Sequence, residues 1–323
     1  MEPLNIFLIG GSGRSGTTVL SRMLSLHPDI SSAPESRYLI DPDGVVDFYV
    51  NANAWSPYHY DLKIKRLESL LRDTGRTGLR DRLVTCGTYL FKNLPWKLRP
   101  RYMGVSVGAY CPDFYKNIDT LIDNLIGFSF KGEWVGMNGA NRKVMHYSSP
   151  ADKEQLSRLL GDFLRKTYRQ INQRQNVRNH LEKNTWNHIW FDKILEILPE
   201  SKLVCIFRDP RDVVSSYCNQ SWMPTDPTQS AVILRDLLLR WERIKSRIPR
   251  TSFHEISLEQ LVSKPEKVLR GICNFYGVPW SDNVLGINLS RPNFGRWKKH
   301  FSKKQAKKVQ VILADFVRAH GYE

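Results

Sequence analysis

Short apolar runs alternate along this chain with longer segments whose apolar residues recur every three or four positions. The runs NIFLI (residues 5–9) and KLVCIF (residues 202–207) are almost uninterrupted, which is typical of strands buried on both faces. Helical periodicity follows the first run at 17–26 and follows the second from near Asp212. A further strand is predicted at 252–256. Strands that alternate with helices indicate an α/β fold with a mostly parallel central sheet flanked by helices.

Helical periodicity also predicts several helices between and after these strands, at 64–71, 153–181, 234–248 and 265–276, the last ending at Gly277. Residues 55–134 are rich in aromatic residues and in glycine and proline breaks, and they predict no single element. We therefore expect one domain spanning 1–323. Residues 1–37 and 182–323 would form its α/β core, and residues 40–181 would form a mostly helical insertion.

Charge and cysteine content narrow the class of protein. The 323 residues include 48 Lys and Arg against 32 Asp and Glu, which gives a net charge of +16. Such a charge favours anionic partners, or it reflects only basic side chains exposed to solvent. The five cysteines are scattered without CxxC pairs, which predicts neither a disulfide framework nor a zinc site. Neither a signal-peptide pattern nor a membrane-length apolar window is present, so we expect a cytoplasmic protein without a transmembrane segment.

A glycine-rich turn lies between the first predicted strand and the first predicted helix. Glycines allow successive backbone N–H groups to face one anion, and the helix N-terminus adds its positive end. The spacing approximates a P-loop, but Thr17 stands in place of the Walker lysine that kinases and NTPases use together with Mg²⁺. A sulfuryl group carries less charge than a phosphoryl group, so Arg14 could neutralise it without a metal ion. The turn reads Gly10-Gly11-Ser12-Gly13-Arg14-Ser15-Gly16-Thr17-Thr18.

The segment Arg14–Thr18, with its following helix and His27-Pro28, resembles the 5′-phosphosulfate loop of PAPS-dependent sulfotransferases. It is most similar to loops that read PRSGTT, as in protein-tyrosine sulfotransferases and many bacterial homologues, although Gly13 replaces the usual proline. The resemblance implies 3′-phosphoadenosine-5′-phosphosulfate (PAPS) as co-substrate, PAP as product and no metal. It covers 5–37 and 182–301, so 40–181 becomes the expected acceptor side. The implied ligands in the loop are Gly13, Arg14, Ser15, Gly16, Thr17 and Thr18.

Two further segments resemble the same family. Arg208 follows a predicted strand and Ser216 lies about two helical turns later, as in the 3′-phosphate motif R-[DN]-P-[RK]-D-x-x-x-S. The alternative for Arg208 is an exposed side chain capped by Asp212. Residues 290–299 resemble the GxWK segment that closes over the nucleotide, or they are a solvated basic helix end. The resemblance makes Arg291, Arg296 and Lys298 candidate ligands of the 3′-phosphate. Where the family often has a tyrosine before a glutamate, this chain has Leu258 before Glu259.

The expected general base is Glu35. Cytosolic sulfotransferases use a histidine two residues after a lysine, but here Thr185 occupies that place after Lys183, and His188 comes a turn later facing elsewhere. Glu35 instead matches the glutamate of the protein-tyrosine enzymes, although it could be a surface residue paired with Arg37. In the family, Lys183 and Arg14 would stabilise charge on the leaving group.

Two other classes of protein, a P-loop kinase or NTPase and a nucleic-acid-binding module, would need features that this sequence lacks. A P-loop kinase or NTPase would need a Walker lysine and a Mg²⁺-binding aspartate, and neither is legible. A nucleic-acid-binding module would combine basic clusters with stacking aromatics in a recognised motif, so we expect no nucleic-acid partner. The acceptor is a hydroxyl compound, possibly anionic: a small molecule, carbohydrate or lipid is favoured, and peptidyl tyrosine stays open. Sequence does not select an oligomeric state.

Overall fold

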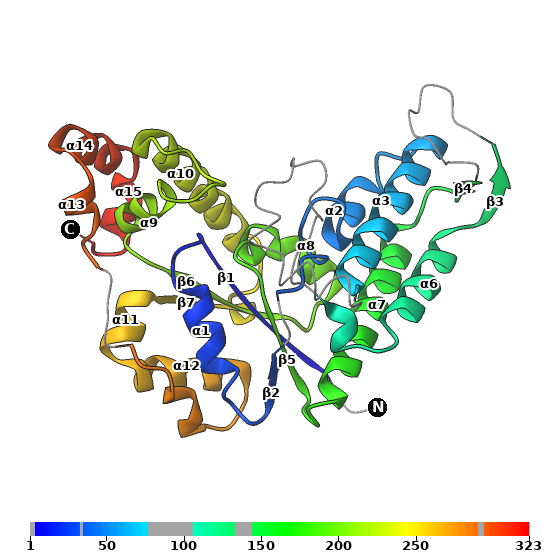
Figure 1. Cartoon of the computed structure of the whole chain (residues 1–323), viewed down its shortest axis with the longest axis horizontal. Helices are drawn as coiled ribbons and strands as arrows, with labels where there is room; N and C mark the ends of the chain where they lie inside the picture. Colours follow the sequence, from blue (N-terminus) through cyan, green and yellow to red (C-terminus); the bar gives the residue numbers. More distant parts are fainter. Residues whose placement is uncertain (1–3, 33–34, 77–105, 133–143, 290–293, 323) are drawn as a thin grey trace, which may run out of the picture. The chain divides into compact units, whose positions relative to one another are not determined.

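A computed structural model describes residues 4–32, 35–76, 106–132, 144–289 and 294–322, which group into two compact units (Figure 1). The sheet unit comprises Asn5–Ser32, Leu181–Asp192 and Glu200–Glu323. The helical unit comprises Met1–Leu4, Ala33–His180 and Lys193–Pro199. Each unit is described by itself below.

A five-stranded sheet forms the centre of the sheet unit, in the order β2-β5-β1-β6-β7. Strand β1 pairs in parallel with β6, Gly11 lying opposite Ile206, and β6 pairs in parallel with β7. The predicted α/β class is therefore confirmed. The strands are β1 (Asn5–Gly11), β2 (Ile30–Ser32), β5 (Asn179–Lys183), β6 (Lys202–Phe207) and β7 (Phe253–Ser257).

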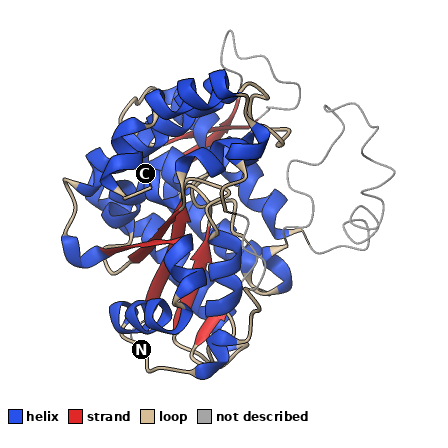
Figure 2. Ribbon diagram, turned by 90° about the vertical axis from the view of Figure 1, so that its left-hand side faces the viewer, coloured by secondary structure: helices blue, strands red, loops and turns tan. Residues whose placement is uncertain are grey.

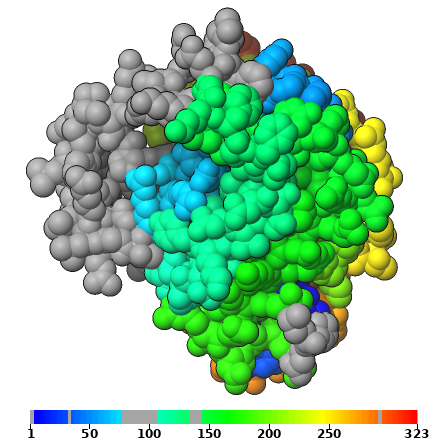
Figure 3. All heavy atoms as spheres, turned by 90° about the vertical axis from the view of Figure 1, so that its right-hand side faces the viewer, coloured from blue at the N-terminus to red at the C-terminus, as the bar shows by residue number. Residues whose placement is uncertain are grey.

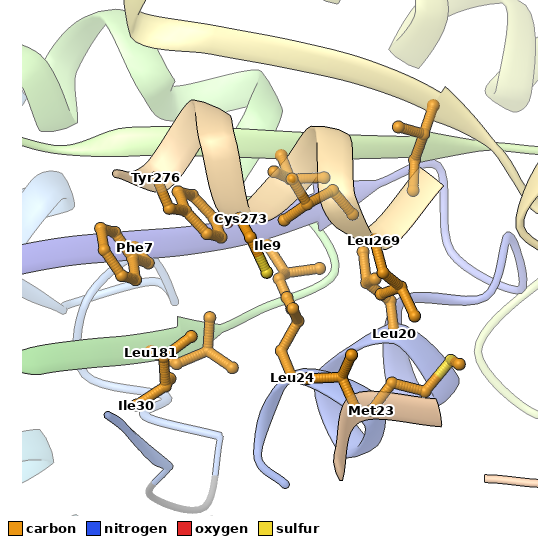
Figure 4. Packing of buried hydrophobic residues seen from close by; sticks show 14 of the residues in the cluster. Phe7, Ile9, Leu20, Met23, Leu24, Ile30, Leu181, Leu269, Cys273 and Tyr276 are labelled. Carbon is orange, nitrogen blue, oxygen red and sulfur yellow. The ribbon is translucent and has the colours of Figure 1, made fainter. Parts of the chain in front are cut away.

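One face of the sheet is covered by α1 (Thr17–Leu24), α11 (Leu258–Ser263) and α12 (Pro265–Tyr276). Phe7 and Ile9 of β1 point toward this layer and meet Leu20, Leu24 and Leu269 there (Figure 4). The ring of Tyr276 stacks on Phe7 at 4.1 Å, and its hydroxyl donates a hydrogen bond to the carbonyl of Leu8 at 2.9 Å. Burial of alternate strand residues on this layer fixes the strand register against the helices.

The opposite face of the sheet packs on α10 (Pro227–Lys245), so helices lie on both sides of the strands (Figure 2). The rings of Trp241 on α10 and Phe253 lie nearly perpendicular, with their centres 5.4 Å apart. The indole N–H of Trp241 donates to Glu255 Oε1 at 2.8 Å. His188 packs against the same indole at 5.9 Å. The remaining elements of this unit are η3 (Asn187–Trp190), α9 (Pro210–Tyr217), η4 (Arg250–Ser252), η5 (Asp282–Leu285), α13 (Trp297–His300), α14 (Lys303–Ile312) and α15 (Ala314–Ala319).

In the helical unit, α6 packs against both α3 and α7. Tyr38 and Phe163 meet Phe114 at ring distances of 5.6 and 6.0 Å. Residues 106–132, drawn in teal, and residues from 144 on, drawn in green, lie side by side in Figure 3. The elements are α2 (Val45–Asn51), α3 (Pro57–Gly75), η2 (Val107–Ala109), α6 (Phe114–Leu125), β3 (Phe128–Lys131), β4 (Val144–Tyr147), α7 (Lys153–Gln173) and most of α8 (Phe191–Ile197).

Several predicted boundaries move. The helix expected at 153–181 ends at Gln173, because the chain leaves it to enter β5. The helix expected from Leu234 begins earlier, at Pro227, where the side chain of Asp226 accepts the N–H of Gln229 at 2.9 Å and caps the first turn. The antiparallel hairpin of β3 and β4 was not predicted. Among the described helices, none has an apolar stretch long enough to cross a bilayer.

Burial of His188 predicts an acid-sensitive fold. Burial is the main reason that the pKa of this imidazole falls to about 3 from its usual 6.5, so the folded state keeps it neutral. The unfolded chain takes up a proton below about pH 6.5, and stability is therefore present above that pH and lost as the pH falls toward 3. Between pH 7.5 and 5.5 one such histidine should cost about 1.4 kcal/mol of unfolding free energy.

Urea unfolding at these two pH values measures the effect. His188→Gln should be less stable at neutral pH but should show a smaller loss on acidification than the wild-type chain. His300→Gln, at an exposed histidine, is the control for the substitution itself. An unchanged slope in His188→Gln would contradict a buried neutral imidazole.

Candidate functional site

The glycine-rich turn between β1 and α1 is wound tightly. Gly13, Arg14 and Gly16 have φ angles of 78°, 57° and 105°, the left-handed region in which glycine is favoured. A side chain at Gly11 would place its Cβ 2.3 Å from the carbonyl oxygen of Ile206 and 2.6 Å from Ser15 Oγ. Only glycine therefore fits at position 11. Turns of this kind form concave backbone sites for anions.

The start of α1 leaves polar groups for a ligand. Gly16 is the N-cap residue and supplies no side-chain hydrogen bond, so the first N–H groups of α1 have no cap from it. Within the described part of the chain, the buried Ser15 Oγ has no hydrogen-bond partner. An unsatisfied buried hydroxyl costs about 1–3 kcal/mol, and an anion in the turn would offset this cost. The turn thus fits an oxyanion such as a phosphosulfate.

Neighbouring elements hold the turn in place. The N–H of Gly11 donates to the carbonyl of Thr185, just after β5, at 2.9 Å. The hydroxyl of Tyr217, at the end of α9, donates to the carbonyl of Ser12. Residues from β5 and α9 therefore meet at the turn that follows β1.

Three predicted ligands from two separate segments lie together here. Arg14 donates from Nε to Ser216 Oγ at 3.0 Å, and Arg208 donates from Nη1 to the carbonyl of Arg14 at 3.5 Å. Arg208 is only 9% exposed and forms an ion pair with Asp212 at 3.3 Å. The alternative interpretation expected Arg208 to be exposed and paired with Asp212. The ion pair is present, but the Arg208 side chain is largely buried. A compact cationic site results at the carboxyl edge of β1 and β6.

Asp212 also fastens the C-terminal segment to this site. Its carboxylate accepts the N–H of Gly295 at 2.7 Å and the N–H of Trp297 at 3.1 Å. The guanidinium of Arg211 lies 4.5 Å from the ring centre of Trp297, and Lys298 Nζ lies 5.7 Å from it. The segment that begins α13 is thus attached to α9. Arg296 is the N-cap residue of α13 but makes no capping hydrogen bond with its side chain, and Arg291 lies outside the described residues.

A second carboxylate supports the loop that follows β6. Glu259 accepts the N–H of Asp209 at 3.0 Å and the hydroxyl of Tyr322 at 3.1 Å. Leu258 covers Gly16, since a Cβ there would meet its Cδ1 at 2.8 Å. Sequence reasoning gave Asp212 as a partner of Arg208 but missed its bonds to Gly295 and Trp297, and it missed the supporting roles of Tyr217, Glu259 and Tyr322. Only the position of Asp212 within the R-D-P-R-D pattern offered a signal.

The two remaining candidate residues lie on different units. Lys183 ends β5 in the sheet unit, next to central β1. Glu35 belongs to the helical unit and pairs with Arg37 at 3.7 Å, and Arg37 also lies 3.9 Å from Asp41. The pairing considered as the alternative for Glu35 is therefore present, and its role as base stays a prediction. Across the described ranges, no three His, Cys, Asp or Glu side chains gather as a metal site.

Comparison with known proteins shows a match to one protein family. The model of the sulfotransferase family matches residues 6–66 and 118–282. The sulfotransferase domain of the Synechococcus PCC 7002 olefin synthase is similar in structure, with 16% identity over 100% of this chain and 95% of that domain and a TM-score of 0.49. A sulfotransferase from Mycobacterium avium has 16% identity over 99% of this chain and 77% of its own, with a TM-score of 0.48. No curated protein sequence matches.

Replacement of Asp212 should release the C-terminal segment. In Asp212→Ala the N–H groups of Gly295 and Trp297 lose a charged acceptor, a contact worth about 1.5–3 kcal/mol, so amide hydrogen exchange across 294–300 should quicken by roughly ten-fold or more. The exposed Asp236, which pairs only locally with Arg235 in the contacts described, is the matched control. Unchanged exchange in Asp212→Ala would show that this carboxylate does not hold the segment.

Proposed function

Because the chain belongs to the sulfotransferase family, we propose that it transfers a sulfuryl group from PAPS to an acceptor hydroxyl. The contact of Arg14 with Ser216 at 3.0 Å, beside Arg208, carries the proposal. It joins the residues that match the family's 5′-phosphosulfate loop to those that match its 3′-phosphate motif. A nucleotide phosphorylated at both positions is the ligand that needs both groups of donors at once.

In this proposal each end of PAPS has its own set of donors. The backbone of Gly13–Thr18, the N-terminus of α1 and Ser15 Oγ bind the 5′-phosphosulfate. Arg208 and Ser216 bind the 3′-phosphate, together with Arg296 and Lys298 from the segment anchored by Asp212. Arg291, which lies outside the described residues, is proposed as a further ligand from the family pattern alone. The net charge of +16 favours approach of such an anion.

The proposed reaction is an in-line displacement at sulfur. The acceptor oxygen forms a bond to sulfur while the bond between sulfur and the 5′-phosphate oxygen breaks, which yields a sulfate ester and PAP. Glu35 takes the hydroxyl proton, and Arg14 and Lys183 stabilise the charge that develops on the leaving phosphate. No metal ion is required. Acceptors favoured by the sequence are small molecules, carbohydrates or lipids.

Arg208→Ala tests the nucleotide assignment. Removal of a charged donor to the 3′-phosphate should weaken PAP binding by about 1.5–3 kcal/mol, measured by isothermal titration in EDTA. Binding of adenosine-5′-phosphosulfate, which lacks that phosphate, should change much less. Arg243→Ala, at an exposed position on α10, is the matched control. Tight Mg²⁺-dependent ATP binding with no response to PAP would instead favour a kinase or NTPase.

Glu35→Gln tests the base. The amide keeps the shape of the side chain but loses its basicity, so PAP affinity should hold while kcat falls by roughly 10²–10⁴. Sulfated product is detected by mass for a panel of phenol, pyranoside and fatty-alcohol acceptors. A phenol ionises more easily than an alcohol, so Glu35→Gln should lower kcat less with the phenol than with the other acceptors.

The controls for the base are Glu266→Gln, at an exposed carboxylate, and His188→Asn. Both should keep kcat within a few-fold of the wild type. Full turnover in Glu35→Gln together with an inactive, folded His188→Asn would return the role of base to histidine.

A further inference from the structure

Two exposed tryptophans of the sheet unit form a corner that the proposed reaction has not yet used. Trp186 follows β5 and is 38% exposed, and Trp222 follows α9 and is 48% exposed. Their ring centres lie 6.2 Å apart with the planes at 80°. Large apolar side chains left partly open to solvent on a folded surface often mark binding sites.

This tryptophan corner (Trp186 and Trp222) borders the phosphate-binding turn directly. A Cβ built at Gly13 would lie 3.6 Å from Cη2 of Trp222 and 3.1 Å from Cγ2 of Thr185, the residue before Trp186. Gly13 directly precedes Arg14, the residue proposed to neutralise the transferred group. An acceptor that contacts the corner would therefore lie next to the sulfuryl end of the donor.

The corner is held by ordered contacts. Trp222 meets the ring of buried Tyr217 at 5.5 Å, and the hydroxyl of Tyr217 is bonded to the carbonyl of Ser12 in the turn. The backbone N–H of Trp186 donates to Oδ1 of buried Asn184 at 3.2 Å. These contacts fix the position of the corner relative to the turn. A preorganised aromatic surface of this kind loses little conformational entropy on binding.

We propose that Trp186 and Trp222 bind the acceptor and select one whose hydroxyl is carried on a ring. This inference rests on the proposed function. With the indoles nearly perpendicular, a flat ring can stack on the face of one and meet the edge of the other, the two arrangements that aromatic pairs prefer. A phenol and a pyranose share the required ring face, and an acyclic alcohol lacks it. Acceptor recognition would then begin in the sheet unit, in addition to residues 40–181.

The test uses the full chain saturated with PAP. Binding of 2-naphthol, methyl β-glucoside and 1-hexanol is measured by isothermal titration in the wild type and in Trp186→Leu and Trp222→Leu. At least one ring probe should bind, and each variant should weaken it by about three- to ten-fold, the range for an aromatic pair. PAP affinity should stay within about two-fold, because the indoles are assigned to the acceptor and not to the nucleotide. Whichever ring probe responds identifies the ring as aromatic or saccharide.

Trp280→Leu is the matched control, since Trp280 stacks on Arg270 at 4.1 Å and bonds Asp282, with no described contact to the corner. It should leave ring-probe binding unchanged. The proposal is overturned if PAP binds but neither ring probe does, if ring binding survives both substitutions, or if hexanol binding falls equally. Thermal unfolding without ligand confirms that each variant folds. A wild-type chain that does not bind PAP contradicts the proposed function itself.

Discussion

The parallel pairing of β1 with β6 is the constraint on which the rest of the site depends. Gly11 lies opposite Ile206, so the turn after β1 and Arg208 after β6 leave the sheet at the same edge. A shift of one residue would turn Phe7 and Ile9 away from α1 and α12, and it would separate Arg208 from the carbonyl of Arg14. The burial that stabilises the sheet unit therefore also brings together the two segments that we propose to bind the phosphates.

Two carboxylates, Asp212 on α9 and Glu259 on α11, hold the segments at this edge of the sheet in place. Asp212 pairs with Arg208 and also accepts two backbone N–H groups of the segment at 295–297. Glu259 links Asp209 to Tyr322 near the end of the described chain. Removing one partner from such a buried network costs more than the pair itself contributes. The arginines are thus positioned in advance, which limits the entropy that ligand binding must overcome.

The environment separates the histidines and carboxylates into different roles. His188 packs on Trp241 inside the fold, where burial lowers its pKa and keeps it neutral. Glu35 instead lies beside Arg37 in the helical unit. The tryptophan corner sits on the sheet unit, next to the turn. The proposed base therefore belongs to the helical unit, whereas the proposed nucleotide ligands and the tryptophan corner belong to the sheet unit.

Sequence alone determined the features that depend on local chemistry. Apolar runs predict β1 and β6, because strands buried on both faces need apolar residues at nearly every position. Strand β7 was predicted at 252–256, although His254 and Glu255 within it are polar. The glycines of the turn were also predicted, since glycine favours positive φ angles at Gly13 and Gly16 and only glycine fits the close approach at Gly11. The pattern around Arg208 and Ser216 was recognisable by its spacing.

Tertiary structure decided the features that depend on distant partners. Strand β5 was missed because Asn179, His180 and Glu182 are polar although they are buried between neighbouring strands. The bonds of Asp212 to Gly295 and of Tyr217 to Ser12 span many residues of chain, and no local pattern encodes them. Trp186 and Trp222 meet only because β5 and α9 end beside the same turn. Contacts between residues far apart in sequence depend on the packing of the whole sheet unit, which local propensities do not specify.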